Sequence, residues 1–397
     1  MKPLHLSHFT ATSCLGRGLE ATLQALRERK SGLKPCDFDI VDLPTYIGEV
    51  SGLEEVQLAP ALKVYDCRNN RLAQLALEQD GFADAVRTAV AKYGTERVGV
   101  FVGTSTSGIL QTELAYRRRD SSSGELPHDF DYDRTQNTFS VADFTRHFFG
   151  IQGPAVAISS ACSSSAKVFA SARRMMEAGL IDAAVVGGVD SLCLTTLYGF
   201  NSLGLCSPQA CRPFDARRDG ISIGEAGAFA LLEWPQGELP KDAVLLAGIG
   251  ESSDAYHMSS PHPEGLGARM AMEQALGSAG LRPQDIDYIN LHGTATPSND
   301  AAEGKAVLDL FGSHTPCSST KGLTGHTLGA AGAIEAVVSA LALQHGLMPA
   351  GANTQTLDPA ISLDYLLDNR KVPVRYVLSN SFGFGGTNCS LVFGRAA

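Results

Sequence analysis

The chain has 397 residues, of which 44% are hydrophobic and 19% are charged, and its formal net charge at pH 7 is −10. This composition is typical of a globular protein that buries a core or two, and it excludes a disordered chain. The acidic balance disfavours nucleic acid as the main partner.

The sequence also bears on the cellular location of the protein and on the state of its cysteines. No apolar run appears long enough to match the roughly 18 residues of a membrane-spanning helix, and the first residues lack a basic-then-apolar signal pattern. The nine cysteines are scattered without a CxxC pair. This argues against a disulfide framework and against a zinc ribbon. We therefore expect a cytoplasmic protein with reduced thiols and no membrane contact.

Strand-like and helical segments alternate through the first half of the chain. The pattern predicts strands at 97–105, 155–159 and 183–191 and helices at about 69–92 and 163–178. A stretch rich in proline and charge at 234–242 reads as a connector.

The alternation resumes after this connector. The second set comprises strands at 243–252, 286–294, 374–380 and 387–394 and helices at 268–280, 301–311 and 330–346. Such alternation favours a layered α/β protein with a buried, largely parallel sheet. It also suggests two similar halves, residues 1–240 and 241–397, although the residues show no convincing repeat.

Cys162 stands where a predicted strand gives way to a predicted helix, in the segment AISSACSSSAK. A thiol there lies near the positive end of a helix dipole and near unpaired backbone N–H groups, which stabilise a thiolate and an oxyanion. This position favours a nucleophile. The alternative, from the residue type alone, is a small buried packing residue.

Three segments of the second half carry further candidates. His292 ends an apolar strand, and His326 lies with Lys321 in a glycine-rich loop. The following helix carries Glu335, and Phe384 begins a glycine-rich turn whose amides are suited to an oxyanion hole. Taken singly, these features have simpler interpretations: a satisfied or surface histidine, an ordinary Lys321–Glu335 ion pair and a tight hairpin.

Taken together, the motifs resemble those of the β-ketoacyl-acyl carrier protein synthases, the condensing enzymes of the thiolase-like fold. SSACSSS, LHGTATPSND, TKGLTGHTLGAAG and NSFGFGGTN occur in the family's order, and the resemblance extends from about residue 60 to 394. The Cys-His-His arrangement is similar to that of the elongating synthases. Initiating synthases have a Cys-His-Asn pattern, and chain-length-factor partners lack the cysteine.

The resemblance implies an α/β fold with two duplicated halves in a layered αβαβα core. It implies a homodimer, or a heterodimer with a chain-length-factor-like subunit, with the segment after Arg117 near the interface. It also implies that the protein acts on acyl and malonyl forms of acyl carrier protein. No cofactor is expected, because phosphopantetheine arrives on the carrier.

The activity implied by the resemblance is a decarboxylative Claisen condensation. Cys162 takes the acyl chain from its carrier while the amides of Cys162 and Phe384 hold the oxyanion. His292 and His326 then donate hydrogen bonds to the thioester oxygen of malonyl-carrier as it loses carbon dioxide. The carbanion attacks the acyl-cysteine, and the chain grows by two carbons, as in fatty acid biosynthesis.

Other residues are implied to support these groups. Lys321, held by Glu335, is expected to keep the histidines neutral and to fix their tautomers. Thr294 and Thr296 match positions that bind the pantetheine arm. Asp300 and Glu303 match positions that orient water or the lysine network.

A metal site formed by His292, His326, Asp300 and Glu303 is the competing interpretation. No HExxH or comparable ligand spacing supports it. We therefore expect no metal.

Substrate preference is implied by two pocket positions. Thr106 falls where a bulkier aliphatic residue often gates the acyl pocket, and Phe200 matches an aromatic residue of that pocket. The N-terminal segment departs from the glycine-rich opening of the housekeeping enzymes. A specialised polyene or polyketide ketosynthase is therefore the alternative to a fatty acid synthase.

Carrier docking on an acidic protein requires a local basic patch. Lys63, Arg68 and Arg71 match the region that relatives use, and Arg117, Arg118 and Arg119 form a second basic cluster. The alternative is a solvated helix face.

Two other classes of protein remain open. A degradative thiolase would show a second catalytic cysteine in a CxG setting, which Cys389 does not provide. A non-catalytic partner protein is the other alternative.

Overall fold

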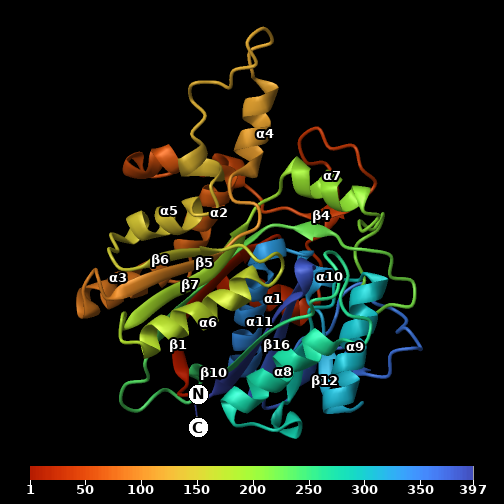
Figure 1. Cartoon of the computed structure of the whole chain (residues 1–397). Helices are drawn as coiled ribbons and strands as arrows, with labels where there is room; N and C mark the ends of the chain where they lie inside the picture. Colours follow the sequence, from red (N-terminus) through yellow and green to blue (C-terminus); the bar gives the residue numbers. More distant parts are fainter. Residues whose placement is uncertain (397) are drawn as a thin grey trace.

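A twelve-stranded sheet runs through both halves of the chain in the computed structural model, which describes residues 1–396 (Figure 1). Its strand order is β14-β12-β11-β16-β17-β10-β1-β9-β7-β5-β6, with β2 paired to β1. The first half contributes β1 (Leu4–Ser13), β2 (Gly16–Arg17), β5 (Val98–Gly103), β6 (Ala155–Ile158), β7 (Ala183–Asp190) and β9 (Ala226–Glu233). The second half contributes β10 (Val244–Ser253), β11 (Tyr288–Asn290), β12 (Pro316–Ser318), β14 (Asp364–Tyr365), β16 (Tyr376–Gly383) and β17 (Thr387–Arg395).

The two halves repeat one topology. In each half, the first of five principal strands (β1 or β10) pairs antiparallel with the fifth (β9 or β17), and the fifth pairs antiparallel with the fourth (β7 or β16). The fourth strand pairs parallel with the second (β5 or β11), and the second pairs parallel with the third (β6 or β12). β1 and β10, the first strand of each half, pair with each other and join the repeats. The expected duplication of the α/β fold is confirmed, and one repeat gives way to the next within 234–243.

The sheet is mixed, so the expectation of a largely parallel sheet is wrong. Antiparallel pairs connect β1, β9 and β7 in one half and β10, β17 and β16 in the other. The alternation of strands and helices could not show this, because it gives no information on the direction in which a strand returns.

Helices form three layers around the two halves of the sheet (Figure 1). α6 (Ser164–Glu177) and α11 (Ala331–His345) pack against each other between the halves. Their close approach requires Gly332, since a Cβ there would meet the backbone nitrogen of Ala166 at 2.6 Å. α2 (Arg68–Leu77), α3 (Phe82–Tyr93) and α5 (Ser140–Phe149) cover one outer face, and α8 (Leu266–Ala279) and α9 (Pro297–Phe311) cover the other.

Shorter elements complete the fold. The remaining α-helices are α1 (Gly18–Glu28), α4 (Ile109–Arg117), α7 (Leu194–Ser202) and α10 (Lys321–Thr324). One small sheet comprises β3 (Lys34–Pro35), β4 (Tyr46–Gly48) and β8 (Ile223–Gly224). A second small sheet comprises β13 (Leu347–Met348) and β15 (Arg370–Lys371). The helix predicted over 69–92 is two helices, because Gly81 adopts a left-handed φ of 68° between them.

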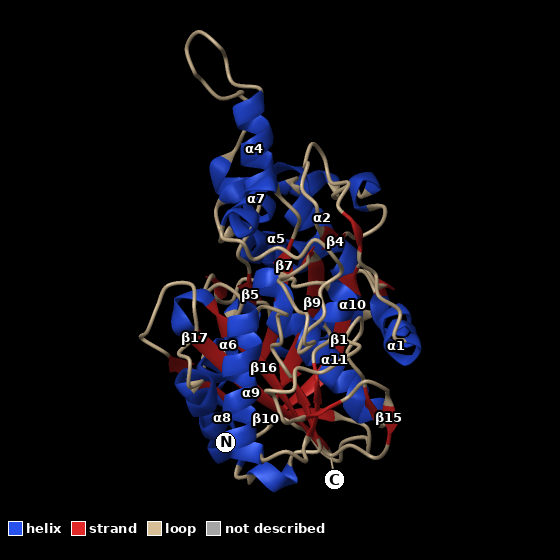
Figure 2. Ribbon diagram, turned by 90° about the vertical axis from the view of Figure 1, so that its right-hand side faces the viewer, coloured by secondary structure: helices blue, strands red, loops and turns tan. Residues whose placement is uncertain are grey.

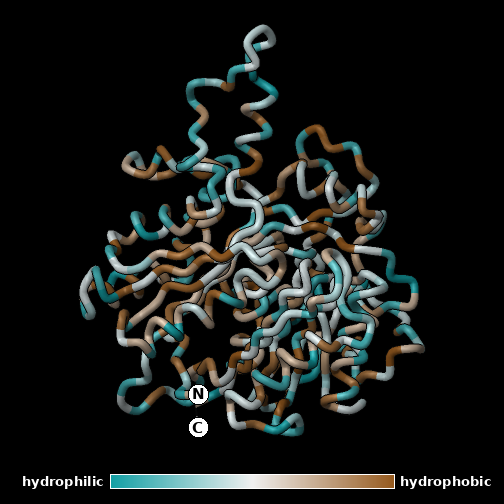
Figure 3. Tube along the Cα trace, in the orientation of Figure 1, coloured by the Kyte–Doolittle hydropathy of each residue, from teal (hydrophilic) through white to brown (hydrophobic). Residues whose placement is uncertain are grey.

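An arm formed by α4 and residues 118–131 projects from the body of the protein (Figures 1 and 2). Figure 3 shows that the outer part of this arm is coloured for neutral to hydrophilic residues, whereas several central strands are coloured for hydrophobic ones.

One helical stretch, Leu328–His345, is long and apolar enough to cross a membrane. The expectation that no apolar stretch reaches this length is therefore wrong. Of this stretch, 89% is buried inside the protein, and it includes α11, the core helix between the two halves.

Candidate active site

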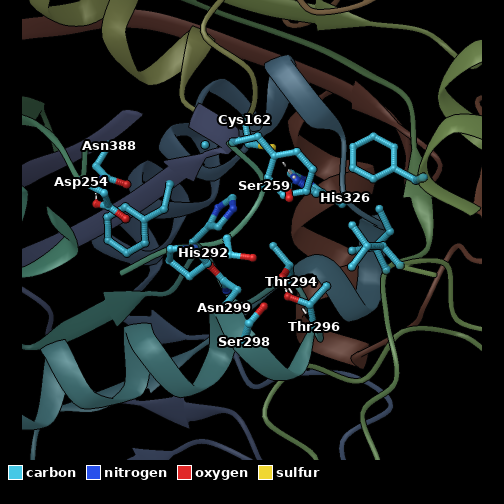
Figure 4. Close-up of a pocket in the computed structure, with 18 residues that line it drawn as sticks. Cys162, Asp254, Ser259, His292, Thr294, Thr296, Ser298, Asn299, His326 and Asn388 are labelled. Atoms are coloured by element: carbon cyan, nitrogen blue, oxygen red, sulfur yellow. Dashed lines mark hydrogen bonds between the residues drawn. The ribbon is translucent and has the colours of Figure 1, made fainter. Parts of the chain in front are cut away.

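Cys162 lies in the turn between β6 and α6, two residues before the helix begins. The preceding residue, Ala161, has a positive φ of 52°, which is rare for alanine and marks a sharp, strained turn. The sulfur is nearly buried, with Cys162 only 6% exposed, and it faces a pocket (Figure 4). The turn therefore presents the thiol to one cavity.

Two histidines from the second half meet this sulfur. His326 follows α10, and its Nε2 lies 3.0 Å from Cys162 Sγ. His292 follows β11, and its ring centroid is 5.3 Å from that of His326 at an interplanar angle of 83°. Both histidines are buried and point into the pocket that contains Cys162 (Figure 4). The expected Cys-His-His group is thus assembled from segments far apart in the sequence.

Lys321 contacts both the backbone and the ring of His292. Its ammonium donates to His292 O at 2.5 Å and lies 3.3 Å from His292 Nδ1. Glu335 of α11 forms an ion pair with it, and both charged side chains are only 2% exposed. An ammonium can only donate, so Nδ1 of the neutral His292 accepts this hydrogen bond and its ring hydrogen lies on Nε2.

The three groups of the Cys-His-His set are uncharged. Burial and then the Lys321 charge lower the pKa of both histidines well below 6.5. Burial raises the pKa of the Cys162 thiol to about 12, although the Lys321 charge and the Phe384 backbone N–H oppose that shift. The resting group is therefore a thiol beside neutral imidazoles, rather than the thiolate that the helix position suggested.

The glycine-rich turn closes over the nucleophile. Residues 384–386 connect β16 to β17, with Gly383 opposite Thr387. A Cβ on Gly383 would lie 3.2 Å from the Cys162 backbone nitrogen and 2.9 Å from Ser160 O. The absence of a side chain at Gly383 therefore lets the Phe384 amide approach the sulfur, as an oxyanion hole requires.

Asp300 and Glu303 hold the loop that carries His292, and neither contacts Lys321. The Glu303 carboxylate accepts from the backbone amides of His292 at 2.8 Å and Gly293 at 2.7 Å. Asp300 accepts from the amides of Phe214 at 2.8 Å and Ala295 at 3.2 Å. These contacts shape the backbone of the His292 loop. The expected role of Asp300 and Glu303 in orienting water or the lysine network stays a prediction.

Glu303 makes stability depend on pH. Burial raises the pKa of this carboxyl to about 7, against opposing hydrogen bonds from the amides of Gly293 and His292. Between about pH 4.5 and 7 the folded protein retains a proton that the unfolded chain has released, so the free energy of unfolding falls as pH rises through this window. The effect is on the order of 3 kcal/mol. Urea unfolding from pH 4.5 to 8 should show a shallower fall for Glu303→Gln than for the surface control Glu273→Gln, and parallel curves would contradict this assignment.

The pocket has a cavity volume of about 50 Å³. Thr294 and Thr296 line it and share a hydrogen bond of 2.9 Å, and the Phe200 ring lies 5.7 Å from the Phe384 ring. Thr106 is not part of this pocket. It is 1% exposed, and its hydroxyl faces Asp190 at 3.0 Å.

Several residues that line the pocket were not predicted: Leu205, Ile221, Asp254, Ser259, Ser260, Pro261, Ser298, Asn299, Phe382 and Asn388. Four of them, Asp254, Ser259, Ser260 and Pro261, lie in the loop that follows β10. Such loops commonly carry functional side chains in α/β proteins, and this signal would have pointed to residues 254–262.

Of the four residues of the competing metal site, His292 and His326 lie together, but Asp300 and Glu303 do not join them. Within residues 1–396, the group able to hold a metal is Cys162, His292 and His326, whose candidate ligand atoms all lie within 4.8 Å of one another. The Asp300 and Glu303 carboxylates instead accept hydrogen bonds from backbone amides. Cys389 is buried in β17 and does not line the pocket.

The structure corrects one basic patch. Arg68 is only 5% exposed and forms ion pairs with Glu225 and two other glutamates. Arg71 pairs with Asp66. Arg68 was predicted to face a partner because its charge was visible in the sequence, while the distant Glu225 that neutralises it was not. Of this patch, Lys63 remains exposed.

The basic cluster on the arm is also partly neutralised. Arg117 pairs with Asp39 at 2.8 Å and Arg118 with Asp129 at 3.0 Å. Arg119 is exposed. The use of these residues in carrier docking stays a prediction.

Known proteins match the chain over most of its length. Residues 9–236 match the family described as Beta-ketoacyl synthase, N-terminal domain, and residues 243–355 match Beta-ketoacyl synthase, C-terminal domain. A 3-oxoacyl-[acyl-carrier-protein] synthase 2 from Coxiella burnetii is 34% identical over 96% of each chain. A mitochondrial 3-oxoacyl-[acyl-carrier-protein] synthase from Arabidopsis thaliana is 43% identical, over 62% of this chain and 57% of that protein.

A solved structure shares the whole fold. It is a ketosynthase in complex with its chain length factor from Xenorhabdus doucetiae, with a TM-score of 0.89 and 38% identity. The match covers 100% of this chain and 98% of the other.

Proposed function

Because this chain belongs to the β-ketoacyl synthase family, we propose that it condenses an acyl chain, held on Cys162, with malonyl-acyl carrier protein. The observation that carries this proposal is the 3.0 Å approach of His326 Nε2 to Cys162 Sγ, beside His292 and its Lys321 anchor. The product is a 3-oxoacyl chain two carbons longer.

The first step is acyl transfer. The Cys162 thiol attacks the acyl-carrier thioester, and its proton passes to the neutral Nε2 of His326. The amides of Cys162 and Phe384 stabilise the oxyanion, and each such donor typically lowers the barrier by about 2.7–4 kcal/mol. When the carrier thiolate leaves, His326 returns the proton to it.

The second step is condensation. Loss of carbon dioxide from malonyl-carrier places negative charge on its thioester oxygen. The Nε2–H of His292 donates to that oxygen, and His326 joins it in the neutral tautomer that carries its hydrogen on Nε2. The resulting carbanion attacks the acyl carbon on Cys162 and expels the sulfur. The released thiolate takes up one proton and regenerates the enzyme.

The proposed chemistry defines the partners. Thr294 and Thr296 line the pocket, where they are placed to bind the pantetheine arm of the carrier. No metal or organic cofactor enters the reaction, because the carrier brings its own phosphopantetheine. A cytoplasmic location agrees with the buried position of the apolar helix α11.

The edge of the sheet supports an assembly of two subunits. β6 pairs only with β5 among the described residues, and its four residues, Ala-Val-Ala-Ile, are half-buried. An apolar edge strand with no charge or proline is a template for pairing with another chain. We expect a second copy, or a homologous chain-length-factor-like subunit, to extend the sheet here about a two-fold axis.

Ala157→Pro should dissociate this assembly. The carbonyls of Pro154 and Ile158 accept hydrogen bonds from β5, so alternation along the strand turns the Ala157 N–H towards the open edge. Proline removes that donor and leaves the β5 side intact. Sedimentation velocity should show monomers for Ala157→Pro and dimers for Ala157→Thr. A dimeric Ala157→Pro would contradict the proposed interface.

A specialised polyene or polyketide ketosynthase is the second candidate function. The chain is 38% identical to the ketosynthase that is solved with its chain length factor, against 34% for the full-length fatty acid relative. The mechanism is the same in both cases, and the product and the second subunit differ.

A product assay tests the proposed function and separates the candidates. The enzyme is incubated with carriers bearing saturated and conjugated acyl chains, together with malonyl-carrier, and products are weighed by mass spectrometry. Products two carbons longer support condensation, and a preference for conjugated primers identifies the specialised pathway. Failure to extend any primer, alone or with a chain-length-factor-like subunit, would contradict the proposal.

A further inference from the structure

α4, the helix of the arm, holds the N-terminus of α7 through a carboxylate that the proposed mechanism does not use. One oxygen of Glu113 accepts hydrogen bonds from the Thr195 amide at 2.7 Å and from the Thr195 hydroxyl at 2.6 Å. The other oxygen accepts from the Leu194 amide at 3.0 Å. The two helices also share an apolar cluster that includes Leu110 and Leu197. Glu113 therefore satisfies the first two backbone N–H groups of α7 from another element.

α7 has no cap of its own. Its N-cap residue, Cys193, makes no side-chain cap hydrogen bond. Sulfur is a weak acceptor, whereas the oxygens of serine, threonine, asparagine and aspartate commonly cap helices. A carboxylate at this end of a helix also interacts favourably with the helix dipole. α7 thus depends on α4 for a cap that helices commonly obtain from their own N-cap residue.

The other end of α7 forms part of the wall of the pocket. Phe200, in the last turn of this helix, lines the pocket that contains Cys162. The Phe200 ring lies 5.7 Å from the Phe384 ring at an interplanar angle of 42°. The backbone N–H of Phe384 faces the Cys162 thiol and is one of the two oxyanion donors in the proposed mechanism. The position of α7 is therefore transmitted by two aromatic rings to an oxyanion donor.

We propose that Glu113 is a positioning residue that caps α7, holds Phe200 against Phe384, and so aligns the Phe384 amide with the oxyanion formed at Cys162. The inference rests on the proposed function, since this oxyanion belongs to acyl transfer at that same site. Because Glu113 lies on the arm, the same contact connects the arm to the pocket.

Two reactions of Cys162 test this role. Transfer of an acyl chain from its carrier passes through an oxyanion. Alkylation by iodoacetamide forms a carbon–sulfur bond as iodide leaves, and it forms no oxyanion. The rate of each modification at Cys162 is followed by peptide mass spectrometry in separate reactions. A carboxylate with a merely structural role would affect both reactions alike.

Glu113→Gln is expected to slow acyl transfer about tenfold and to leave alkylation unchanged. Glutamine keeps one acceptor oxygen but turns an NH₂ donor towards a backbone N–H of α7. Thr195→Val, which removes one donor to Glu113, should slow acyl transfer by less, and it keeps the test valid if Glu113→Gln does not fold. Glu125→Gln, on the exposed outer part of the arm, should behave as wild type.

Cys193→Ser provides a matched rescue, because serine at the N-cap gives α7 a cap of its own. Combined with Glu113→Gln, it should restore most of the acyl transfer rate. Equal slowing of both reactions by Glu113→Gln would overturn the inference, as would wild-type acyl transfer in both Glu113→Gln and Thr195→Val. A selective loss that Cys193→Ser fails to restore would also overturn it. Absence of any acyl adduct on wild-type Cys162 would overturn the proposed function itself, and the inference with it.

Discussion

Cys162→Gln is expected to lose condensation by at least about 10³-fold while it continues to release carbon dioxide from malonyl-carrier. Condensation needs the sulfur, because the acyl chain is held on it as a thioester. Decarboxylation needs only hydrogen-bond donors at the malonyl thioester oxygen, and His292 and His326 remain in this variant. Carbon dioxide release and product formation are measured in the same reaction.

Cys162→Ala and Cys211→Ala serve as controls for this result. Cys162→Ala should also fail to form an acyl adduct. Cys211 is another buried cysteine, whose Sγ lies 3.1 Å from Lys321 O, but it does not line the pocket. Loss of condensation in Cys211→Ala to the same extent as in Cys162→Ala would contradict the assignment of the nucleophile.

Lys321→Met is expected to destabilise the protein by about 3–5 kcal/mol, because it leaves the Glu335 carboxylate buried without its partner. Lys321→Met/Glu335→Gln removes both charges and should regain much of that stability. His292 nevertheless loses the ammonium that fixes its tautomer. Carbon dioxide release by the double variant should therefore stay about 10²-fold below wild type, the scale for one misplaced oxyanion donor.

The comparison of stability with activity decides the role of Lys321. Urea unfolding gives the stability, and carbon dioxide release gives the activity. Lys305→Met, which breaks an exposed ion pair with Glu264, should change neither appreciably. Wild-type decarboxylation by the double variant would contradict a role for Lys321 in holding His292.

The chemistry of the site was readable from sequence because its parts lie in short motifs. Cys162, Lys321 and His326 each sit in a segment of small residues, and the glycines of the GFGGTN turn favour a close backbone approach. Their spacing in the chain carries no information on distance. The recognised family supplied the expectation that they meet, and the 3.0 Å sulfur–nitrogen contact fulfils it.

Features that depend on distant partners were not predicted. Arg68 was assigned to a surface patch because its partner Glu225 lies 157 positions away. Thr106 was placed in the pocket by correspondence, but Asp190, 84 positions later, draws its hydroxyl away. Propensity and periodicity report local preference, and they do not identify which buried charges compensate one another.

The direction of the strands was also not predictable from the sequence pattern. β9 and β17 each return antiparallel to the preceding strand of their half, which converts the expected parallel sheet into a mixed one. β1 was not predicted as a strand, yet it lies between β9 and β10 and joins the two halves. Its alternation of buried Leu4 and Leu6 with His5 and Ser7 is typical of a strand, so the signal was present in the sequence.

The most direct test of the central claim is a single-turnover chase on wild-type enzyme. Acyl-carrier is incubated with the protein, free carrier is removed, and the acyl adduct is located on Cys162 by peptide mass spectrometry before malonyl-carrier is added. We expect the adduct to disappear as one equivalent of 3-oxoacyl-carrier, two carbons longer, is formed. An adduct that maps to another residue, or one that persists on Cys162 after malonyl-carrier is added, would contradict the account.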